Sequence, residues 1–354
     1  MTMAGDVVVA GVGMITAVGL SAAETAASVR AGTARFAETK LLDKRRAPFT
    51  LAEVPEAGLP PLAPALATGV LSSRETRMLR LGVVALRECL RALPQGQPLP
   101  APAPGLALAL PETNTNLPLD AKAFLQRFAQ QAAGSFDPQR SDAGFRGRAG
   151  GLGAIGRAAE AIRTGVAPFM LAGGIDTYRD LYVLGALDLE QRVKSAVNLD
   201  GFIPGEGAAF VLLARPDVAP TPLATLSQVA HGIEPGHLYS EAPYRGDGLA
   251  AAIQQLVLQG GHEGPIQEVY SSMNGENHWA KEWGVAFIRS SAAFLTDHGM
   301  HHPADCYGDA GAACGALMVG LAAHGIKHGY RRSPALVYGS SDRGERAAVM
   351  VKAA

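Results

Sequence analysis

The sequence contains few cysteines, and its first apolar run is not preceded by a basic segment. The 354 residues include three cysteines, Cys89, Cys306 and Cys314. An odd, sparse set of this kind predicts reduced thiols in a cytoplasmic protein and argues against a disulfide framework. No basic segment precedes the first apolar run, which we therefore interpret as a strand and not as a signal peptide.

An excess of charge of one sign and long hydrophobic runs are also missing. The net charge is −1, from 31 Lys and Arg against 32 Asp and Glu, so no global field attracts nucleic acid or an anionic membrane. No apolar run reaches the roughly 18 residues that a membrane span needs. Hydrophobic residues make up 48% of the chain and charged residues 18%, which is typical of a globular protein with a large core.

Strands and helices alternate along the chain. Residues 7–11 are predicted to form a short buried strand, and helices are expected from Ser21 to Ala31 and from Ser72 or Ser73 to Ala92, because serine is a favoured N-cap. The proline-rich run at 93–105 could be an interdomain linker. We favour a surface loop within one domain, because a buried strand is predicted directly after the proline-rich run.

Two helices rich in tiny residues, each followed by a strand, occur once in each half of the chain. The first is predicted from Ala149 to Thr164, closed by Gly165, and the second is the segment AGAACGALMVGLAAHG, closed by Gly325. Small side chains allow close packing, so both helices are expected at the centre of the molecule. The repetition predicts two similar α/β halves, residues 1–216 and 217–354.

A partial dinucleotide fingerprint follows the first strand. Gly11, Gly13 and Thr16 match its beginning, but the last glycine is missing. The acid farther on, Glu24, lies within a predicted helix and does not end a second strand, as the fingerprint requires. We interpret the segment as a structural turn and predict no cofactor.

Three segments resemble the β-ketoacyl synthases. They are VVVAGVGMITAVGLSAAETAASVRAG, AIGRAAEAIRTGVAPFMLAGGID and NLDGFIPGEGAAFVLL, the last being similar to the family's "DGFvpGEGAg". The matches lie in about the first 215 residues, and the remainder matches in pattern but not in signature. The resemblance implies an α/β thiolase fold, with two βαβ-rich halves in a five-layer α-β-α-β-α arrangement, usually dimeric through edge strands of the N-terminal half. The strand PFMLAGG is expected near that seam.

The residue at the position of the family's nucleophilic cysteine is Arg148. Family condensation needs a thiolate at the start of the central helix, and an arginine that stays protonated cannot carry an acyl group. Arg148 could bind an anion in a remodelled pocket. We favour the alternative that it forms a salt bridge at the surface or at an interface.

Three further positions depart from the family pattern. Asn274 stands in place of the first histidine, and Gly308 or Asp309 in place of the second. Asparagine cannot exchange protons, and a carboxylate would repel a developing oxyanion. The family's glycine-rich gating loop becomes the charged segment SSDRGER at 340–346. Together these four departures predict a degenerate site.

Other residues could carry chemistry of their own. Cys306 is the best surviving nucleophile, although a buried, inert thiol is the commoner case. Metal-ligand residue types gather at His298, His301, His302, Asp305 and Cys306. Their spacing matches no standard zinc pattern, so no metal site is predicted. Trp279 and Trp283 are expected to form a core or interface stripe, and Glu206 to be a buried structural carboxylate.

Two functions from different classes remain open. One is a binding, scaffold or adaptor protein that forms a homodimer, or a heterodimer with a related thiolase-fold chain, as chain-length factors do. The segments "NGE…EW" and "GDxGAA" also look like thiolase-like proteins encoded beside type VI secretion effectors, so a secreted effector is a candidate partner. The other function is an acyl-thioester transferase or hydrolase that uses Cys306.

Overall fold

The computed structural model describes residues 7–67, 69, 71–91, 103–112, 119–219, 221–260 and 264–354. Its strands are β1 (Val7–Thr16), β2 (Ala37–Leu42), β3 (Pro48–Leu51), β4 (Gly105–Leu110), β5 (Asp142–Phe145), β6 (Phe169–Thr177), β7 (Glu206–Ala214), β8 (Ala224–Leu226), β9 (Ala230–Ile233), β10 (Ile266–Ser271), β11 (Phe294–His301), β12 (Ala335–Ser340) and β13 (Glu345–Lys352). Its α-helices are α1 (Ala22–Arg30), α2 (Pro64–Ala67), α3 (Ser73–Leu90), α4 (Ala121–Gln131), α5 (Gly147–Arg163), α6 (Leu181–Leu189), α7 (Asp247–Gln259), α8 (Asn277–Ser290), α9 (Ala304–Tyr307) and α10 (Cys314–Lys327). None of the described helices is long and apolar enough to cross a bilayer.

The strands of the two halves repeat one pattern. The main sheet runs β11-β10-β12-β13-β8-β1-β7-β6-β4-β5, with β9 also paired to β13. In the N-terminal half, β5, β4 and β6 are parallel, and β7 and then β1 follow antiparallel. In the C-terminal half, β11, β10 and β12 are parallel, and β13 and then β8 follow antiparallel. The predicted internal duplication is therefore visible in the strand order.

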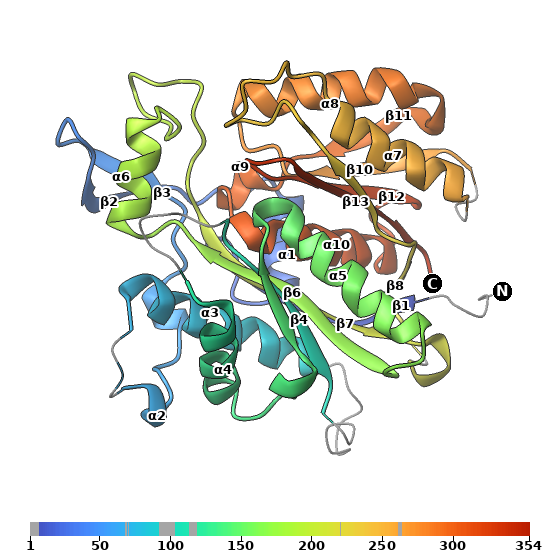
Figure 1. Cartoon of the computed structure of the whole chain (residues 1–354), viewed down its shortest axis with the longest axis horizontal. Coiled ribbons are helices and arrows are strands. Elements are labelled where there is room, and N and C mark those ends of the chain that lie inside the picture. The colour runs from blue at the N-terminus through green and yellow to red at the C-terminus, as the bar shows by residue number, and fades with distance from the viewer. Residues whose placement is uncertain are drawn as a thin grey trace.

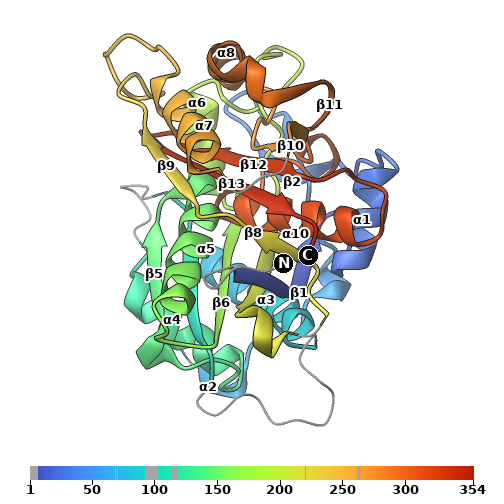
Figure 2. The same ribbon diagram turned by 90° about the vertical axis from the view of Figure 1, so that its right-hand side faces the viewer.

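The helices form three layers around the two half-sheets (Figure 1). α5 and α10 contact each other and lie between the half-sheets, because each contacts strands of both. α3 and α4 cover the outer face of the N-terminal half-sheet, and α7 and α8 cover the outer face of the other (Figures 1 and 2). The predicted five-layer arrangement is confirmed. The boundary at residue 216 stays a prediction.

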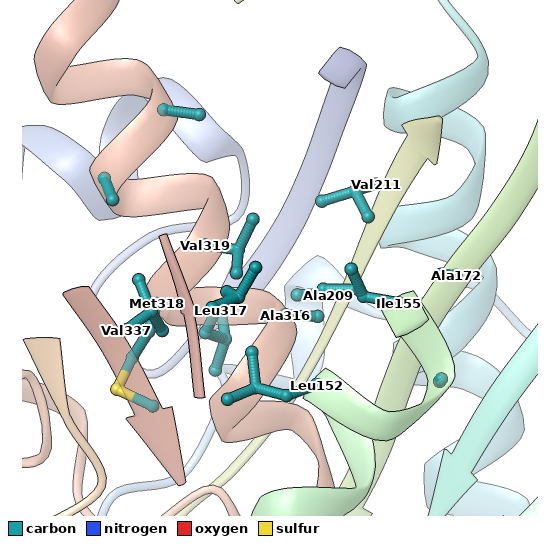
Figure 3. Packing of buried hydrophobic residues seen from close by; sticks show 14 of the residues in the cluster. Leu152, Ile155, Ala172, Ala209, Val211, Ala316, Leu317, Met318, Val319 and Val337 are labelled. Carbon is teal, nitrogen blue, oxygen red and sulfur yellow. The ribbon is translucent and has the colours of Figure 1, made fainter. Parts of the chain in front are cut away.

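Tiny residues let the two central helices approach closely. A Cβ added at Gly315 would lie 2.7 Å from the backbone nitrogen of Leu152, and one at Gly151 would lie 3.0 Å from that of Ala316. Apolar side chains of both helices, including Leu152 and Leu317, fill the space around this crossing (Figure 3). Both helices are buried at the centre of the molecule, as the sequence predicts.

The predicted N-caps are correct. The Ser21 side chain accepts from the backbone N–H of Glu24 over 3.2 Å, and the Ser72 side chain accepts from that of Glu75 over 3.1 Å. The predicted helix end at Ala92, and the proline-rich residues up to 102, lie outside the described residues.

Gly325 does not end the second central helix. α10 continues to Lys327, and the left-handed residue after it is Gly329, with a φ of 70°. A Cβ at Gly325 would lie 2.5 Å from a side-chain carbon of Arg331. This glycine therefore gives room to the segment that folds back onto the helix.

The predicted turn at Gly11 and Gly13 is wrong, because both glycines lie within β1. A Cβ at Gly13 would lie 1.9 Å from the carbonyl oxygen of Ala85. Close packing of α3 against this strand therefore accounts for the glycine.

The strand PFMLAGG does not lie at an edge. It begins β6, which is paired with β4 on one side and β7 on the other. The edge strand of the N-terminal half-sheet is β5, which directly precedes α5.

Candidate functional site

The start of α5 is held by the loop between β12 and β13. The Ser341 hydroxyl accepts from the backbone N–H of Ala149 over 2.9 Å and donates to the carbonyl oxygen of Arg146 over 2.5 Å. This hydroxyl satisfies one of the unpaired N–H groups that every helix start leaves open. The charged segment 340–346 is thus fastened to the helix that carries Arg148.

Arg148 is buried, with 2% of its surface exposed. Its Nε donates to Asp309 Oδ2 and its Nη1 to Asp342 Oδ1, each over 2.6 Å. The guanidinium carbon lies 4.9 Å from the ring centroid of Trp279. The predicted carboxylate contact is present, but the predicted surface position is wrong, because two carboxylates and an aromatic face compensate for the loss of water.

Arg148 and Asn274 both donate to the same carboxylate oxygen, Oδ2 of Asp309. The Nδ2 group of Asn274 donates to Asp309 Oδ2 over 2.8 Å, and the backbone N–H of Gly311 donates to Asp309 Oδ1 over 2.8 Å. Gly308 directly precedes Asp309, and its backbone has a positive φ of 71°. The structure therefore brings Arg148, Asn274 and Asp309 together in one buried cluster.

Arg192 and Glu276 complete this cluster, although no sequence motif predicted a role for them. Arg192 binds Glu276 through two hydrogen bonds of 2.8 and 2.9 Å, and its Nη1 donates to Asp342 Oδ2 over 2.7 Å. Glu276 also accepts from Asn274 over 3.0 Å. We call the set the buried ion network: Arg148, Arg192, Asn274, Glu276, Asp309 and Asp342.

The charges of the network stabilise one another. Burial lowers the pKa of Arg148, but the carboxylates of Asp309 and Asp342 raise it more, so that the pKa lies well above its usual range. Burial raises the pKa of Asp342, but Arg148 and Arg192 lower it more, so that the pKa lies well below its usual range. Arg148 and Asp342 are therefore ionised at neutral pH, and Arg148 cannot act as a proton donor or as a nucleophile.

A cavity of about 330 Å³ opens beside the network. Its lining is mixed in charge and includes Arg74, Glu112, Arg148, Tyr178, Asp342 and Arg343. Burial, and then the nearby Asp342 carboxylate, raise the pKa of Glu112 to about 7. Among the residues that the structure describes, no cysteine or histidine lines this cavity.

The nearest candidate thiols are poorly placed for catalysis. The Sγ atom of Cys314 lies 3.7 Å from Asp309 Oδ1, and burial together with that carboxylate raises its pKa well above the usual range. Cys306 lies on α9 and lines a different cavity, and burial raises its pKa as well. Because the thiolate is the reactive form, a raised pKa lowers the nucleophilicity of both residues at neutral pH.

The histidines near Cys306 have separate hydrogen-bond partners. His301 Nε2 pairs with Glu268 over 2.7 Å, and His302 Nδ1 pairs with Ser271 over 2.7 Å. Within the described ranges, no group of three or more His, Cys, Asp or Glu side chains is arranged to hold a metal ion.

The two tryptophans of α8 differ in their surroundings. Trp283 stacks on Tyr338 at 5.1 Å within the core, as predicted. Trp279 is buried, and the guanidinium carbons of Arg148 and Arg346 lie 4.9 and 5.6 Å from the centroid of its ring. The position of Trp279 beside the buried ion network was not predicted, because two aromatic residues four positions apart on a helix are equally typical of a hydrophobic core.

Glu206 is a buried structural carboxylate, as predicted. It accepts the backbone N–H of Val54 over 2.7 Å and the Thr177 hydroxyl over 2.7 Å, and it pairs with Arg77 over 2.5 Å. These bonds join β7 to α3 and to the loop after β3.

Known proteins with a similar sequence or structure identify the type of fold. A sequence profile of the β-ketoacyl synthase N-terminal domain matches residues 148–219. A chain of the ishigamide ketosynthase/chain length factor is 16% identical, with 99% of both chains covered and a TM-score of 0.78. The chain has a β-ketoacyl synthase-like, thiolase-type fold.

Two other ketosynthase structures resemble this thiolase-type fold as closely. The ketosynthase ApeO with its chain length factor ApeC from Xenorhabdus doucetiae is 14% identical, with 99% of this chain and 98% of that chain covered and a TM-score of 0.79. An oxazolomycin ketosynthase domain from Streptomyces albus JA3453 is 15% identical, with 99% and 74% covered and a TM-score of 0.80. No curated protein matches the sequence.

Proposed function

We propose that this chain is a catalytically inactive β-ketoacyl synthase-like protein that acts as a binding, scaffold or adaptor subunit. The observation that carries the proposal is the buried ion network. At the helix start where a condensing enzyme needs a thiolate, Arg148 is bonded to Asp309 and Asp342. An ionised guanidinium offers no electron pair for attack on a thioester.

The residues around Arg148 also oppose the second half of condensation. Decarboxylation and attack develop negative charge, which hydrogen-bond donors must stabilise. Here the Asp309 carboxylate lies in the cluster, and it already accepts hydrogen bonds from Asn274 Nδ2 and Arg148 Nε. The network is therefore better suited to a structural role than to stabilising a reaction intermediate.

The partner we propose is a second thiolase-fold chain, either a copy of this protein or a related one. Two of the similar structures carry a chain length factor in their names. Among the described strands, β5 ends the sheet and has a side that pairs with none of the others. The resemblance of the segments "NGE…EW" and "GDxGAA" to thiolase-like proteins encoded beside type VI secretion effectors supports a secreted effector as the cargo of such an adaptor.

The test is a condensation assay with malonyl- and acyl-thioesters, combined with intact mass measurement of the protein. We expect no ketoacyl product above a no-enzyme control and no acyl adduct. Arg148→Cys supplies a thiol at a helix start, so we expect slow self-acylation but still no condensation. Product formation by the unmodified protein would overturn the proposal.

The same experiment also tests an alternative function, in which Cys306 is a nucleophile. Cys306 lines a cavity together with His301 and His302, so it could act as the nucleophile of an acyl-thioester transferase or hydrolase. Turnover that disappears in Cys306→Ala would establish this alternative, although the raised pKa of the thiol opposes it.

A further inference from the structure

A second cavity shares no lining residue with the first. Its volume is about 220 Å³. It is bounded by α1, α9, α10 and the ends of β10 and β11, and α1 packs beside α10 (Figure 2). None of the residues of the buried ion network lines this cavity.

Two arginines without a carboxylate partner line this cavity. The guanidinium carbons of Arg30 and Arg331 lie 4.6 and 5.7 Å from the ring centroid of Tyr330. Among the residues that the structure describes, neither arginine has an acidic oxygen within 4.0 Å. The Nε atom of Arg331 is buried and has no hydrogen-bond partner. A buried donor of this kind is costly unless an acceptor reaches it.

The remaining charges in the cavity do not cancel these two. Asp305 is the one carboxylate in the lining, and it is exposed and forms no ion pair with the described residues. His301 and His302 use one ring nitrogen each for Glu268 and Ser271. The lining therefore carries a net positive charge in a protein whose net charge is −1.

Several other residues of the lining are apolar. Ala26, Val29 and Leu321 form one side, and Met300 and Pro303 contribute from the other elements. A cavity of about 150 Å³ is enough to hold a benzene ring. The volume here fits one ring or a short branched chain together with an anionic head.

We propose that this cavity binds a small organic oxyanion, with a carboxylate or phosphate head bound by Arg30 and Arg331 and a compact apolar body against Val29 and Leu321. Guanidinium groups bind both kinds of head through paired hydrogen bonds. The arginines recognise the charge, and the apolar side selects the size of the body.

The experiment is calorimetric titration of the full chain with benzoate, phenyl phosphate and the neutral control benzyl alcohol. We expect one of the two anions to bind with a Kd of about 1 mM or tighter, and benzyl alcohol to bind at least about tenfold more weakly. The preferred anion identifies the head group. Equal binding of benzyl alcohol, or no binding of either anion, would overturn the proposal.

Variants locate the site. Arg30→Gln and Arg331→Gln are each expected to weaken anion binding about tenfold. Arg35→Gln, which removes the same charge from an exposed neighbour outside the lining, should leave the affinity unchanged. Arg30 is exposed, so its variant keeps the test valid if Arg331→Gln fails to fold. An equal loss in Arg35→Gln would show a non-specific charge effect and reject the site.

Alkylation provides an independent readout. Cys306 is the one cysteine in the lining, and Cys89 and Cys314 are buried elsewhere. We expect the bound anion to slow alkylation of Cys306 by iodoacetamide, measured by peptide mass spectrometry. An unchanged rate at saturating anion would place the ligand elsewhere.

Discussion

At the scale of single residues, the buried ion network sets this protein apart. Arg148 and Asp309 are both almost completely buried, and each is the main charged partner of the other. A buried ion pair adds little over an apolar pair of the same shape, but removing one partner leaves an uncompensated charge. The network therefore makes each of its members depend on the others.

A double-mutant cycle tests this dependence. Arg148→Met and Asp309→Asn are each expected to lower the free energy of unfolding by about 3–5 kcal/mol. The double variant should lose clearly less than the sum, because no charge is then left alone. Urea denaturation followed by circular dichroism measures the three values.

The exposed pair of Arg157 and Asp142 is the control. Arg157→Met should cost less than about 1 kcal/mol, because water screens an exposed pair. Additive losses for Arg148→Met and Asp309→Asn would show that the pair does not act as a unit.

At the scale of elements, the crossing of α5 and α10 holds the site in place. The buried ion network joins α5 to the segments before α10 and after β12, so a shift of either helix would separate Arg148 from Asp309 and Asp342. Glycines at the crossing set the distance between the helices. Gly315 has no room for a Cβ against the backbone of α5, whereas Gly153 has its nearest neighbour at 3.8 Å.

Gly315→Ala and Gly153→Ala form a matched pair. We expect Gly315→Ala to lower the free energy of unfolding by about 1–3 kcal/mol, because the helices must move apart. Gly153→Ala should instead raise it by up to about 1 kcal/mol, since alanine restricts the unfolded chain and favours a helix. Thermal unfolding compares the two. Equal effects of the same sign would show that the crossing tolerates a side chain.

At the scale of the whole molecule, the repeated strand order leaves two edges. β5 ends the main sheet on one side and β11 on the other. An edge strand exposes unpaired backbone groups and is usually covered or paired. β5 directly precedes α5, so a partner on this edge would lie next to the start of the helix that carries Arg148.

We expect the protein to associate at micromolar concentration, with itself or with a related chain, through β5. Light scattering coupled to size-exclusion chromatography measures the mass. Gly144→Lys should shift the protein towards monomer, because a Cβ at Gly144 meets nothing within 4 Å in the single chain, whereas a charge on the edge opposes strand pairing.

Gly284→Lys, at an equally open position on α8, should leave the mass unchanged. A wild-type protein that is only monomeric, and that finds no partner chain, would contradict pairing through this edge.

The sequence by itself determined the alternation of strands and helices, the N-caps and the two small-residue helices. Each of these depends on residues within a few positions of one another, such as Ser21 with Glu24. It also determined which residue types are missing from the candidate site, because the identity of Arg148 or Asn274 can be read directly.

Only the tertiary structure decided that Arg148 is buried and which residues neutralise it. Its partners Asp309 and Asp342 lie 161 and 194 positions away in the chain, and Arg192 and Glu276 join them from separate segments. No local periodicity encodes such pairs. They arise because the repeated strand order and the crossing of α5 and α10 bring the ends of distant elements to one point.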